Sequence, residues 1–230
     1  MEAALYNKAI QCPVCNNDFN ITKVKSKTSK MLKRDADFCV HYEGVNPILY
    51  DAWVCEHCGY SAQADKFEEI SSKDASTIYE NIASRWNKRS FSGERTTDTA
   101  IEAFKLALFN AQIRKAKASE IAKICIRIAW LYRFNNDEKE KDFLNFALKS
   151  YDEAFQKEKF PIDKLDENTC MYMIGELHRR VGNIDESVKW FSRLISSPEA
   201  RKNPTIVEAA REQYQLAKEE LGKGKSSTAS

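Results

Sequence analysis

Four cysteines occur as two pairs with the same spacing, Cys12-Pro-Val-Cys15 and Cys55-Glu-His-Cys58. A C-x-x-C turn directs two thiolates toward one point, and two such turns supply the four soft ligands of a tetrahedral Zn²⁺ site. Because four protein ligands leave no position for water or substrate, the spacing predicts one structural Zn²⁺. Gly59, directly after Cys58, tolerates the positive φ that such turns often need.

An iron or redox centre and a pair of disulfides are the alternatives to zinc. A thioredoxin-like motif has one C-x-x-C beside a βαβ pattern, whereas this chain has two without that pattern. The chain begins Met-Glu-Ala-Ala, with no charged-then-apolar leader, which predicts a cytoplasmic location where disulfides are rare. Cys39, His41 and His57 are also competent ligands, but we expect them to lie outside the metal site, Cys39 as a small buried residue.

The segment between the two pairs is longer than in a simple ribbon. It holds 39 residues between Cys15 and Cys55, counted from the printed sequence, against about 15 to 20 in the usual spacing. An inserted hairpin or loop is therefore expected. Residues 22–27 and 48–54 are the strand-like stretches of this region.

The composition limits the class of protein. The chain has 230 residues and a formal charge of +2, from 36 basic and 34 acidic side chains. This near balance makes nucleic-acid binding unlikely, because such domains are usually plainly basic. No apolar run approaches the roughly 18 residues of a membrane span, so no membrane partner is expected. With 7 glycines and 5 prolines, the composition favours long helices.

A shift in composition near residue 65 predicts two domains and a tail. We assign residues 1–64 to a zinc-ribbon-like head, 65–221 to a helical domain and 222–230 to a disordered tail. In 171–195, small Gly175 is followed by a turn at Gly182, then by Ser187 and Phe191, in the order typical of a tetratricopeptide repeat. Looser copies surround 129–154 and 100–107. The predicted fold is mainly α: a tetratricopeptide-like helical solenoid with a small N-terminal β subdomain.

Several segments together resemble one family. They are Cys12-Pro-Val-Cys15, Asp35-Ala-Asp37, Asn46-Pro-Ile-Leu-Tyr50, Val54-Cys-Glu-His-Cys-Gly-Tyr60, Ala100-Ile-Glu-Ala-Phe-Lys-Leu-Ala-Leu108 and Ile174-Gly-Glu-Leu-His-Arg-Arg-Val-Gly182. In combination they resemble the bacterial proteins grouped as domain-of-unknown-function family 2225. The resemblance implies a cytoplasmic bacterial protein with a zinc-ribbon-like head and a tetratricopeptide-like body. It implies no catalytic residues, because that family is defined without an activity.

The residues favour a binding protein over an enzyme. There is no Gly-rich phosphate loop, H-E-x-x-H or nucleophile elbow in the sequence, and Asp35 with Asp37 more often caps or turns a loop than catalyses. A solenoid of this kind most often binds a protein partner in its groove. The repeat geometry predicts a common concave surface for five residues, namely Trp130, Arg133, Glu176, Arg179 and Arg180. The alternative is that Trp130 packs between helices and the arginines pair with Glu176 and its neighbours.

The alternative is a sensor of a small anionic ligand, such as a cyclic dinucleotide. Arg85 and Arg89 are four residues apart, with Trp86 between them and Arg95 in a following loop. On one helical face the two guanidinium groups could bind phosphate, and the tryptophan could stack on a base. The R-x-x-x-R and S-x-x-G order distantly resembles the cyclic-di-GMP motif of PilZ-type receptors. The sequence leaves both functions, and the oligomeric state, open.

Overall fold

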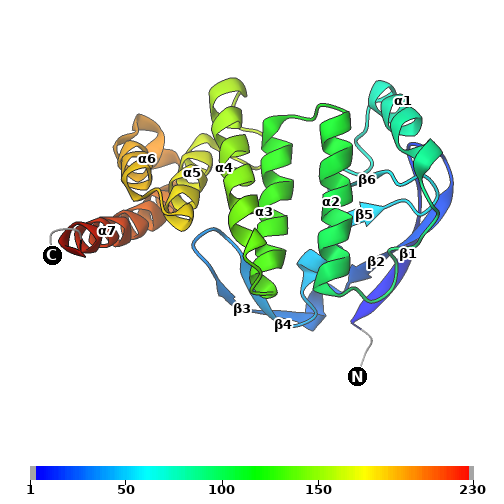
Figure 1. Ribbon diagram of the computed structural model, residues 1–230, viewed down its shortest axis with the longest axis horizontal. Helices are drawn as coiled ribbons and strands as arrows, with labels where there is room; N and C mark the ends of the chain where they lie inside the picture. The colour runs from blue at the N-terminus through cyan, green and yellow to red at the C-terminus, as the bar shows by residue number, and fades with distance from the viewer. Residues whose placement is uncertain (1–3, 228–230) are drawn as a thin grey trace.

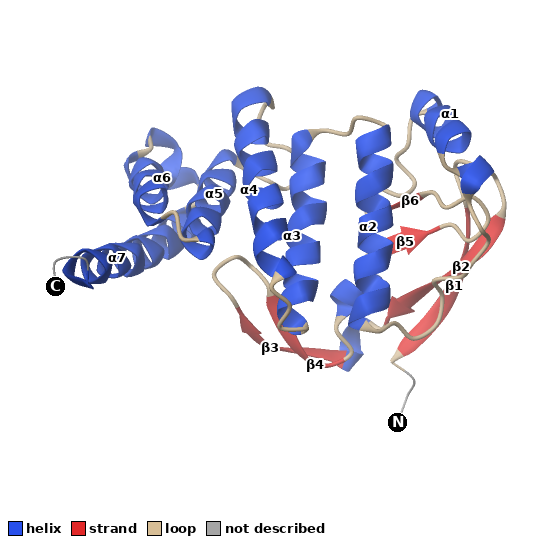
Figure 2. Ribbon diagram, viewed as in Figure 1, coloured by secondary structure: helices blue, strands red, loops and turns tan. Residues whose placement is uncertain are grey.

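The computed structural model describes residues 4–227 and is mainly helical, with short antiparallel strands in the N-terminal part (Figures 1 and 2). The strands are β1 (Leu5–Gln11), β2 (Asp18–Val24), β3 (Ser29–Arg34), β4 (Val40–Gly44), β5 (Ala52–Val54) and β6 (Ser61–Gln63). The helices are α1 (Ser72–Asn81), α2 (Thr97–Ile113), α3 (Ala118–Phe134), α4 (Lys139–Lys157), α5 (Glu167–Val181), α6 (Ile184–Ser196) and α7 (Pro204–Ser227). Short 3-10 turns are η1 (Ser26–Thr28), η2 (Pro47–Tyr50), η3 (Ala83–Arg85) and η4 (Pro198–Lys202).

The strands form three separate two-stranded ribbons, and two of these ribbons carry the cysteine pairs. β1 pairs with β2 in a register that places Gln11 opposite Asp18, and the turn between them contains Cys12 and Cys15. β5 pairs with β6, with Val54 opposite Ser61, and this turn contains Cys55 and Cys58. Each C-x-x-C is therefore the turn of a β-hairpin.

The third ribbon, β3–β4, is the inserted hairpin that the long cysteine spacing predicts. Its register places Met31 opposite Tyr42 and Arg34 opposite Val40, with an irregularity between Met31 and Lys33. In Figure 1 this ribbon leaves the head and runs along the lower ends of α3 and α4 toward α5. The β3–β4 hairpin therefore connects the head with helices α3 and α5 of the body.

Helices α2 to α7 follow one another side by side from the head toward the C-terminus (Figure 1). Polar side chains mark where several of them begin, because an oxygen at the N-cap satisfies an otherwise unpaired amide. Thr96 caps α2 by accepting from the amide of Thr99, and Asp166 caps α5 by accepting from the amide of Thr169. The expected small positions of α2, Ala100 and Ala107, are fully or almost fully buried.

The small residue of the best repeat unit has the packing that the pattern predicts. A Cβ placed on Gly175 of α5 would lie 2.8 Å from the Phe191 ring of α6. Gly182 ends α5 in the left-handed conformation, with φ of 93°. The two helices therefore cross closely because Gly175 has no side chain and Phe191 fills the space above it.

Several predicted boundaries differ from the structure. Ile78 and Ile82, at and just after α1, lie in the hydrophobic core of the head, while Ile48 and Val54 of the head lie in the core of the helices. The head therefore extends past the predicted boundary at 64/65 and shares a core with the body. α7 continues to Ser227, so the predicted disordered tail starts within a helix, and its last three residues lie outside the described residues.

The two strand-like stretches are shorter than predicted. β2 ends at Val24, and a 3-10 turn follows at Ser26–Thr28. In the second stretch, Pro47 begins the turn η2 and the side chain of Asn46 accepts from the amide of Ile48. A proline after an asparagine cap suits the start of a turn, and the strand β5 therefore begins only at Ala52.

Candidate metal centre

The two cysteine turns have the same backbone hydrogen bonds. In the first, the amide of Asn16 donates to the carbonyl of Cys12 at 2.9 Å, and in the second the amide of Gly59 donates to the carbonyl of Cys55 at 2.9 Å. Both residues have positive φ, 58° for Asn16 and 74° for Gly59. The expectation for Gly59 is therefore confirmed, and Asn16, which tolerates this conformation among non-glycine residues, serves the same purpose.

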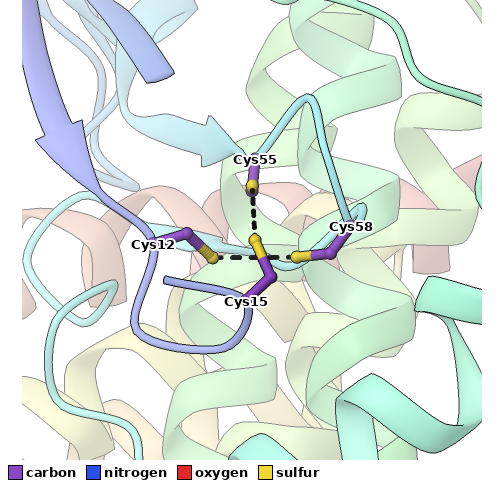
Figure 3. Close-up of side chains that lie close together, drawn as sticks. All are labelled: Cys12, Cys15, Cys55 and Cys58. Atoms are coloured by element: carbon purple, nitrogen blue, oxygen red, sulfur yellow. Dashed lines mark hydrogen bonds between the residues drawn. The ribbon is translucent and has the colours of Figure 1, made fainter. Parts of the chain in front are cut away.

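The four thiols converge on one point (Figure 3). The Sγ atoms of Cys12 and Cys58 are 3.7 Å apart, as are those of Cys15 and Cys55, and all four lie within 4.8 Å of one another. A tetrahedral ion with metal–sulfur bonds of about 2.3 Å has sulfur atoms about 3.8 Å apart. A disulfide needs about 2.05 Å. The arrangement therefore fits a metal ion and excludes these disulfides.

The centre is buried beneath aromatic side chains of the head. Cys12 and Cys55 are fully buried and Cys58 is 2% exposed. Phe67 packs against the rings of Phe19, Trp53 and Tyr60, and its carbonyl accepts a hydrogen bond from the Tyr60 hydroxyl at 3.0 Å. Cys15 is only partly buried, so the centre is enclosed on the side of Cys12, Cys55 and Cys58 and reaches the surface at Cys15. The packed aromatic side chains help to hold the ligands in place.

Contacts among the thiols change their acidity. Hydrogen bonding with Cys55 raises the pKa of Cys12 to about 12, and contact with Cys12 raises the pKa of Cys58. Hydrogen bonds from the same neighbours lower the pKa of Cys55 to about 2. These thiols are therefore close enough for the charge on one to alter the acidity of the others. Metal binding must displace the protons that the thiols carry.

Trp86 covers the second cysteine turn. Its indole Nε1 donates to the carbonyl of Glu56 at 2.8 Å, and a Cβ on Gly59 would lie 2.4 Å from the Trp86 ring. Trp86 therefore supports this cysteine turn, and the ring face that packs on Gly59 is not available to stack on a base. The sequence did not predict this contact. Trp86 lies 28 residues after Cys58, and the contact depends on how the intervening chain folds back.

The predicted phosphate clamp of the sensor hypothesis does not form. Arg85 ends the turn η3 and residues 86–89 have no regular structure, so Arg85 and Arg89 do not share a helical face. Arg89 pairs with Glu102 at 2.6 Å and lies over the rings of Trp86 and Phe91. Its charge is already matched within the chain.

Arg95 is a structural residue. It is 5% exposed, and its guanidinium donates to the carbonyls of Phe91, Leu49 and Ala52 at 2.8 to 3.0 Å. Burial lowers the pKa of Arg95 to about 10, which still leaves it charged at neutral pH. It ties the head to the start of α2, and the prediction of a ligand-binding role for it is wrong.

The five groove residues form an internal ion network with the tip of the β3–β4 hairpin, here called the Asp37 network. Asp37 is fully buried. Its carboxylate accepts from the Trp130 indole at 3.0 Å and from Arg133 at 2.6 and 3.0 Å. The network contains further ion pairs. Arg133 also pairs with Asp35 and Glu140, Arg180 pairs with Asp37 and Glu176, and Arg179 pairs with Glu176 and Glu220.

This network corrects the prediction of a site made of those residues. Trp130 is 7% exposed, and the three arginines are paired with carboxylates of the same chain. The sequence predicted only that Asp35 and Asp37 cap or turn a loop. In the structure both carboxylates also form ion pairs with Arg133 of α3. The sequence signal was the pair of acids in the insert, but only the path of the hairpin places them there.

A second group of ligand-type side chains lies beside this network. Asp35, Cys39 and His41 have ligand atoms within 4.8 Å of one another. However, His41 Nε2 is 2.8 Å from the Asp35 carboxylate, a hydrogen-bond distance shorter than the roughly 3.3 Å between two oxygen or nitrogen ligands of a tetrahedral ion. His57 is bonded to the carbonyl of Asp18 at 3.1 Å. The geometry therefore favours Cys12, Cys15, Cys55 and Cys58 alone as metal ligands.

A large cleft lies between the hairpin and the helices, with a volume of about 1110 Å³. One face of the β3–β4 ribbon forms a wall, through Met31, Arg34, Val40 and Tyr42. One stripe of α3 forms the floor, through Ser119, Lys123, Ile126, Arg127 and Trp130. The loops before α3 and before α5 form the far side. The sequence alone did not predict that Arg34 and Arg127 line a cleft, because it did not predict that the β3–β4 hairpin lies against α3.

The fold and the site together define a mainly helical protein with an N-terminal cluster of four cysteines that could bind a metal ion. A family model described as an uncharacterized protein conserved in bacteria, DUF2225, matches residues 5–217. The chain belongs to this family, as the sequence resemblance indicates. None of the curated proteins and no solved structure matches the chain. No helix in the described part of the chain is long and apolar enough to cross a membrane.

Proposed function

We propose that this chain is a non-enzymatic, cytoplasmic binding protein that receives a protein partner in the cleft between its β3–β4 hairpin and helix α3. The single observation that carries the proposal is the cleft itself. Its volume of about 1110 Å³ exceeds the roughly 300 to 1000 Å³ of most small-molecule sites, which favours a segment of a protein.

The metal centre has a structural role in this proposal, and zinc is the ion that fits it best. Four thiolates at tetrahedral spacing are the ligand set of structural zinc sites, and iron is the alternative that the same set would hold. The ion would connect the turns of the β1–β2 and β5–β6 ribbons. The β3–β4 hairpin, which forms the cleft wall, lies between these two ribbons in the sequence. Loss of the ion would therefore loosen one wall of the cleft.

The nucleotide-sensor alternative has less support. Arg85 and Arg89 do not share a helical face, and Trp86, Arg89 and Arg95 have internal contacts that a ligand would have to replace. Titration calorimetry of the protein with cyclic dinucleotides would test it. Binding that is weakened by Arg89→Ala would revive the sensor hypothesis.

Site-specific photocrosslinking tests the proposed cleft. The photoreactive amino acid p-benzoylphenylalanine is introduced at Lys123, which lines the cleft, and as a control at Lys149, an exposed residue of α4 that does not line it. Each variant is expressed in bacteria and irradiated in the cells. We expect the variant with the photoreactive residue at position 123 to form a crosslinked adduct of defined mass with another protein, and the variant at position 149 to form none. Equal labelling at both positions, or no adduct at 123, would contradict the proposal.

A further inference from the structure

The charges that line the cleft are not evenly matched. Most of its acids already face a base: Asp37 pairs with Arg133, Asp51 with Arg127, Asp65 with Lys123, Glu69 and Asp163 with Lys66, and Glu120 with Arg114. Among the described residues, four lining cations have no carboxylate within ion-pair distance, namely Arg34, Lys115, Lys117 and Lys164. On the same criterion, Asp74 is the unpaired acid. Because Lys66 pairs with two acids, two acidic charges in all remain against these four cations, and the unmatched charge of the cleft is a small positive excess.

The unpaired lysines gather at one end of the cleft. Lys115 and Lys117 belong to the loop that leads into α3, and Lys164 belongs to the loop that leads into α5. All three side chains are exposed. An anionic group at this end would meet several cations without displacing an internal partner.

The opposite end of the cleft offers aromatic and apolar surface. Arg34 lies 4.3 Å over the Phe38 ring, and Arg127 lies 5.0 Å over the Trp130 ring. Arg127 already pairs with Asp51 at 3.4 Å. Within the described part of the chain Arg34 has no such pair, and a guanidinium stacked on an aromatic ring can still offer its N–H groups at the edge to a carboxylate. Met31, 60% exposed, and the half-buried Tyr42 complete this wall.

The distance between the two ends sets the length of the occupant. Ser119 and Trp130 are eleven positions apart on α3, which is about 17 Å at 1.5 Å per residue. An extended peptide advances about 3.3 Å per residue, so about five residues would cover this length. A mononucleotide is too short to reach both ends.

From these observations we propose that the cleft binds an extended acidic segment of a partner protein, with carboxylates at Lys115, Lys117 and Lys164 and one large apolar side chain at the Met31–Trp130 end. This inference rests on the proposed function and names the chemistry of its ligand. The Asp37 network supplies an internal example of the same chemistry. There the hairpin tip presents Asp37 to Arg133 and Trp130, while Phe38 stacks on Tyr172 at 5.2 Å.

Selection from a phage library of random decapeptides on the immobilised full-length protein tests this proposal. We expect the enriched peptides to be acidic and to contain a large apolar side chain. The affinity of the most enriched peptide is then measured by fluorescence anisotropy with the double variant Lys117→Glu/Lys164→Glu. The matched control is Lys8→Glu/Lys149→Glu, which changes the net charge by the same amount at exposed positions outside the cleft.

The cleft variant should bind at least about tenfold more weakly, and the control should remain within about twofold of the wild type. Lys117→Glu is not expected to impair folding, because it places an acid at the N-terminus of α3. Enrichment of neutral or basic peptides, no enrichment, equal effects of the two variants, or displacement of the peptide by a mononucleotide would each overturn the inference. If the position-123 adduct still forms, the proposed function survives that failure.

Discussion

At the scale of single residues, the metal centre depends on more than its four ligands. Gly59 allows the second cysteine turn to adopt a positive φ and also lets Trp86 approach it. The indole of Trp86 in turn holds the carbonyl of Glu56. One glycine therefore satisfies two independent requirements, one of the backbone and one of packing.

Gly59→Ala is predicted to destabilise the protein more than Gly93→Ala. Both positions have positive φ, but a Cβ at Gly93 meets nothing within 4 Å, whereas at Gly59 it meets the Trp86 ring. The shared backbone cost is about 1 to 2 kcal/mol, and overpacking adds about 1 to 3 kcal/mol at Gly59. Urea unfolding measures both free energies. Equal losses would show that Trp86 does not cover the turn.

At the scale of elements, the β3–β4 hairpin determines how the head meets the helices. Its tip places the buried Asp37 against α3 and α5, and Tyr172 of α5 donates to the carbonyl of Ala36 at 2.9 Å. Desolvation raises the pKa of Asp35, but hydrogen bonds from His41 and Arg133 outweigh it and lower the pKa below its usual value. The stability from Asp35 is therefore present above the unfolded carboxyl pKa of about 4 and is lost as the pH falls through the lower folded value.

Asp37→Ala is predicted to release the hairpin from the helices. The variant leaves the indole of Trp130 without its buried acceptor and removes one of the three carboxylates that pair with Arg133, which costs about 1 to 3 kcal/mol. Hydrogen exchange of residues 29–44 should accelerate strongly. Glu43→Ala removes an exposed 3.8 Å pair with Lys30 and serves as a control that should change stability by less than about 1 kcal/mol. Unchanged exchange in Asp37→Ala would mean that the network does not hold the hairpin.

Two glycine-to-alanine substitutions in helices, one in α5 and one in α7, are predicted to change stability in opposite directions. Gly175→Ala adds a methyl group 2.8 Å from Phe191 and should destabilise by about 1 to 3 kcal/mol. Gly222→Ala, in the helix α7 with nothing within 4 Å of the new Cβ, should stabilise by up to about 1 kcal/mol through helix propensity. Thermal unfolding distinguishes the two. A stabilising Gly175→Ala would refute the close crossing.

Local patterns in the sequence predicted local structure well. The two C-x-x-C turns, the inserted hairpin, the helices and the Gly175 contact all depend on residues near one another or on a periodic pattern. The contacts of Trp86 and Asp37 were not predictable, because they join segments 30 and 93 residues apart through the path of the chain. The pairing of the arginines with Glu176 was one of the two alternatives that the sequence left open. The further pairs of Arg133 and Arg180 with Asp37 were not predictable, because the path of the hairpin creates them.

At the scale of the whole molecule, head and body form one unit. Ala52 and Val54 of the second metal-bearing ribbon share a core with α2 to α5, and Arg95 bonds to carbonyls on the head side of this junction. A composition boundary in the sequence does not reveal such a shared core. A metal ion bound by the four cysteines would therefore be expected to stabilise the helices as well as the head.

Cys55→Ser is predicted to lower the melting temperature of the entire chain in a single transition. The variant loses one of four ligands, and metal affinity contributes to folding energy when the ligands come from distant segments. Circular dichroism at a helical wavelength follows α2 to α7, and protease resistance follows the head. Cys125→Ser, at a buried cysteine remote from the centre, is the control for the loss of a thiol. Helices that melt at the wild-type temperature while the head is degraded would show two independent units.

Cys12, Cys15, Cys55 and Cys58 are expected to hold one metal ion. X-ray absorption spectroscopy at the zinc edge, on protein purified without chelator, tests this because it reports the ion and its ligands together. We expect one zinc per chain with four sulfur ligands at about 2.3 Å. Absence of zinc and of any other metal, or a shell that contains nitrogen or oxygen ligands, would contradict it.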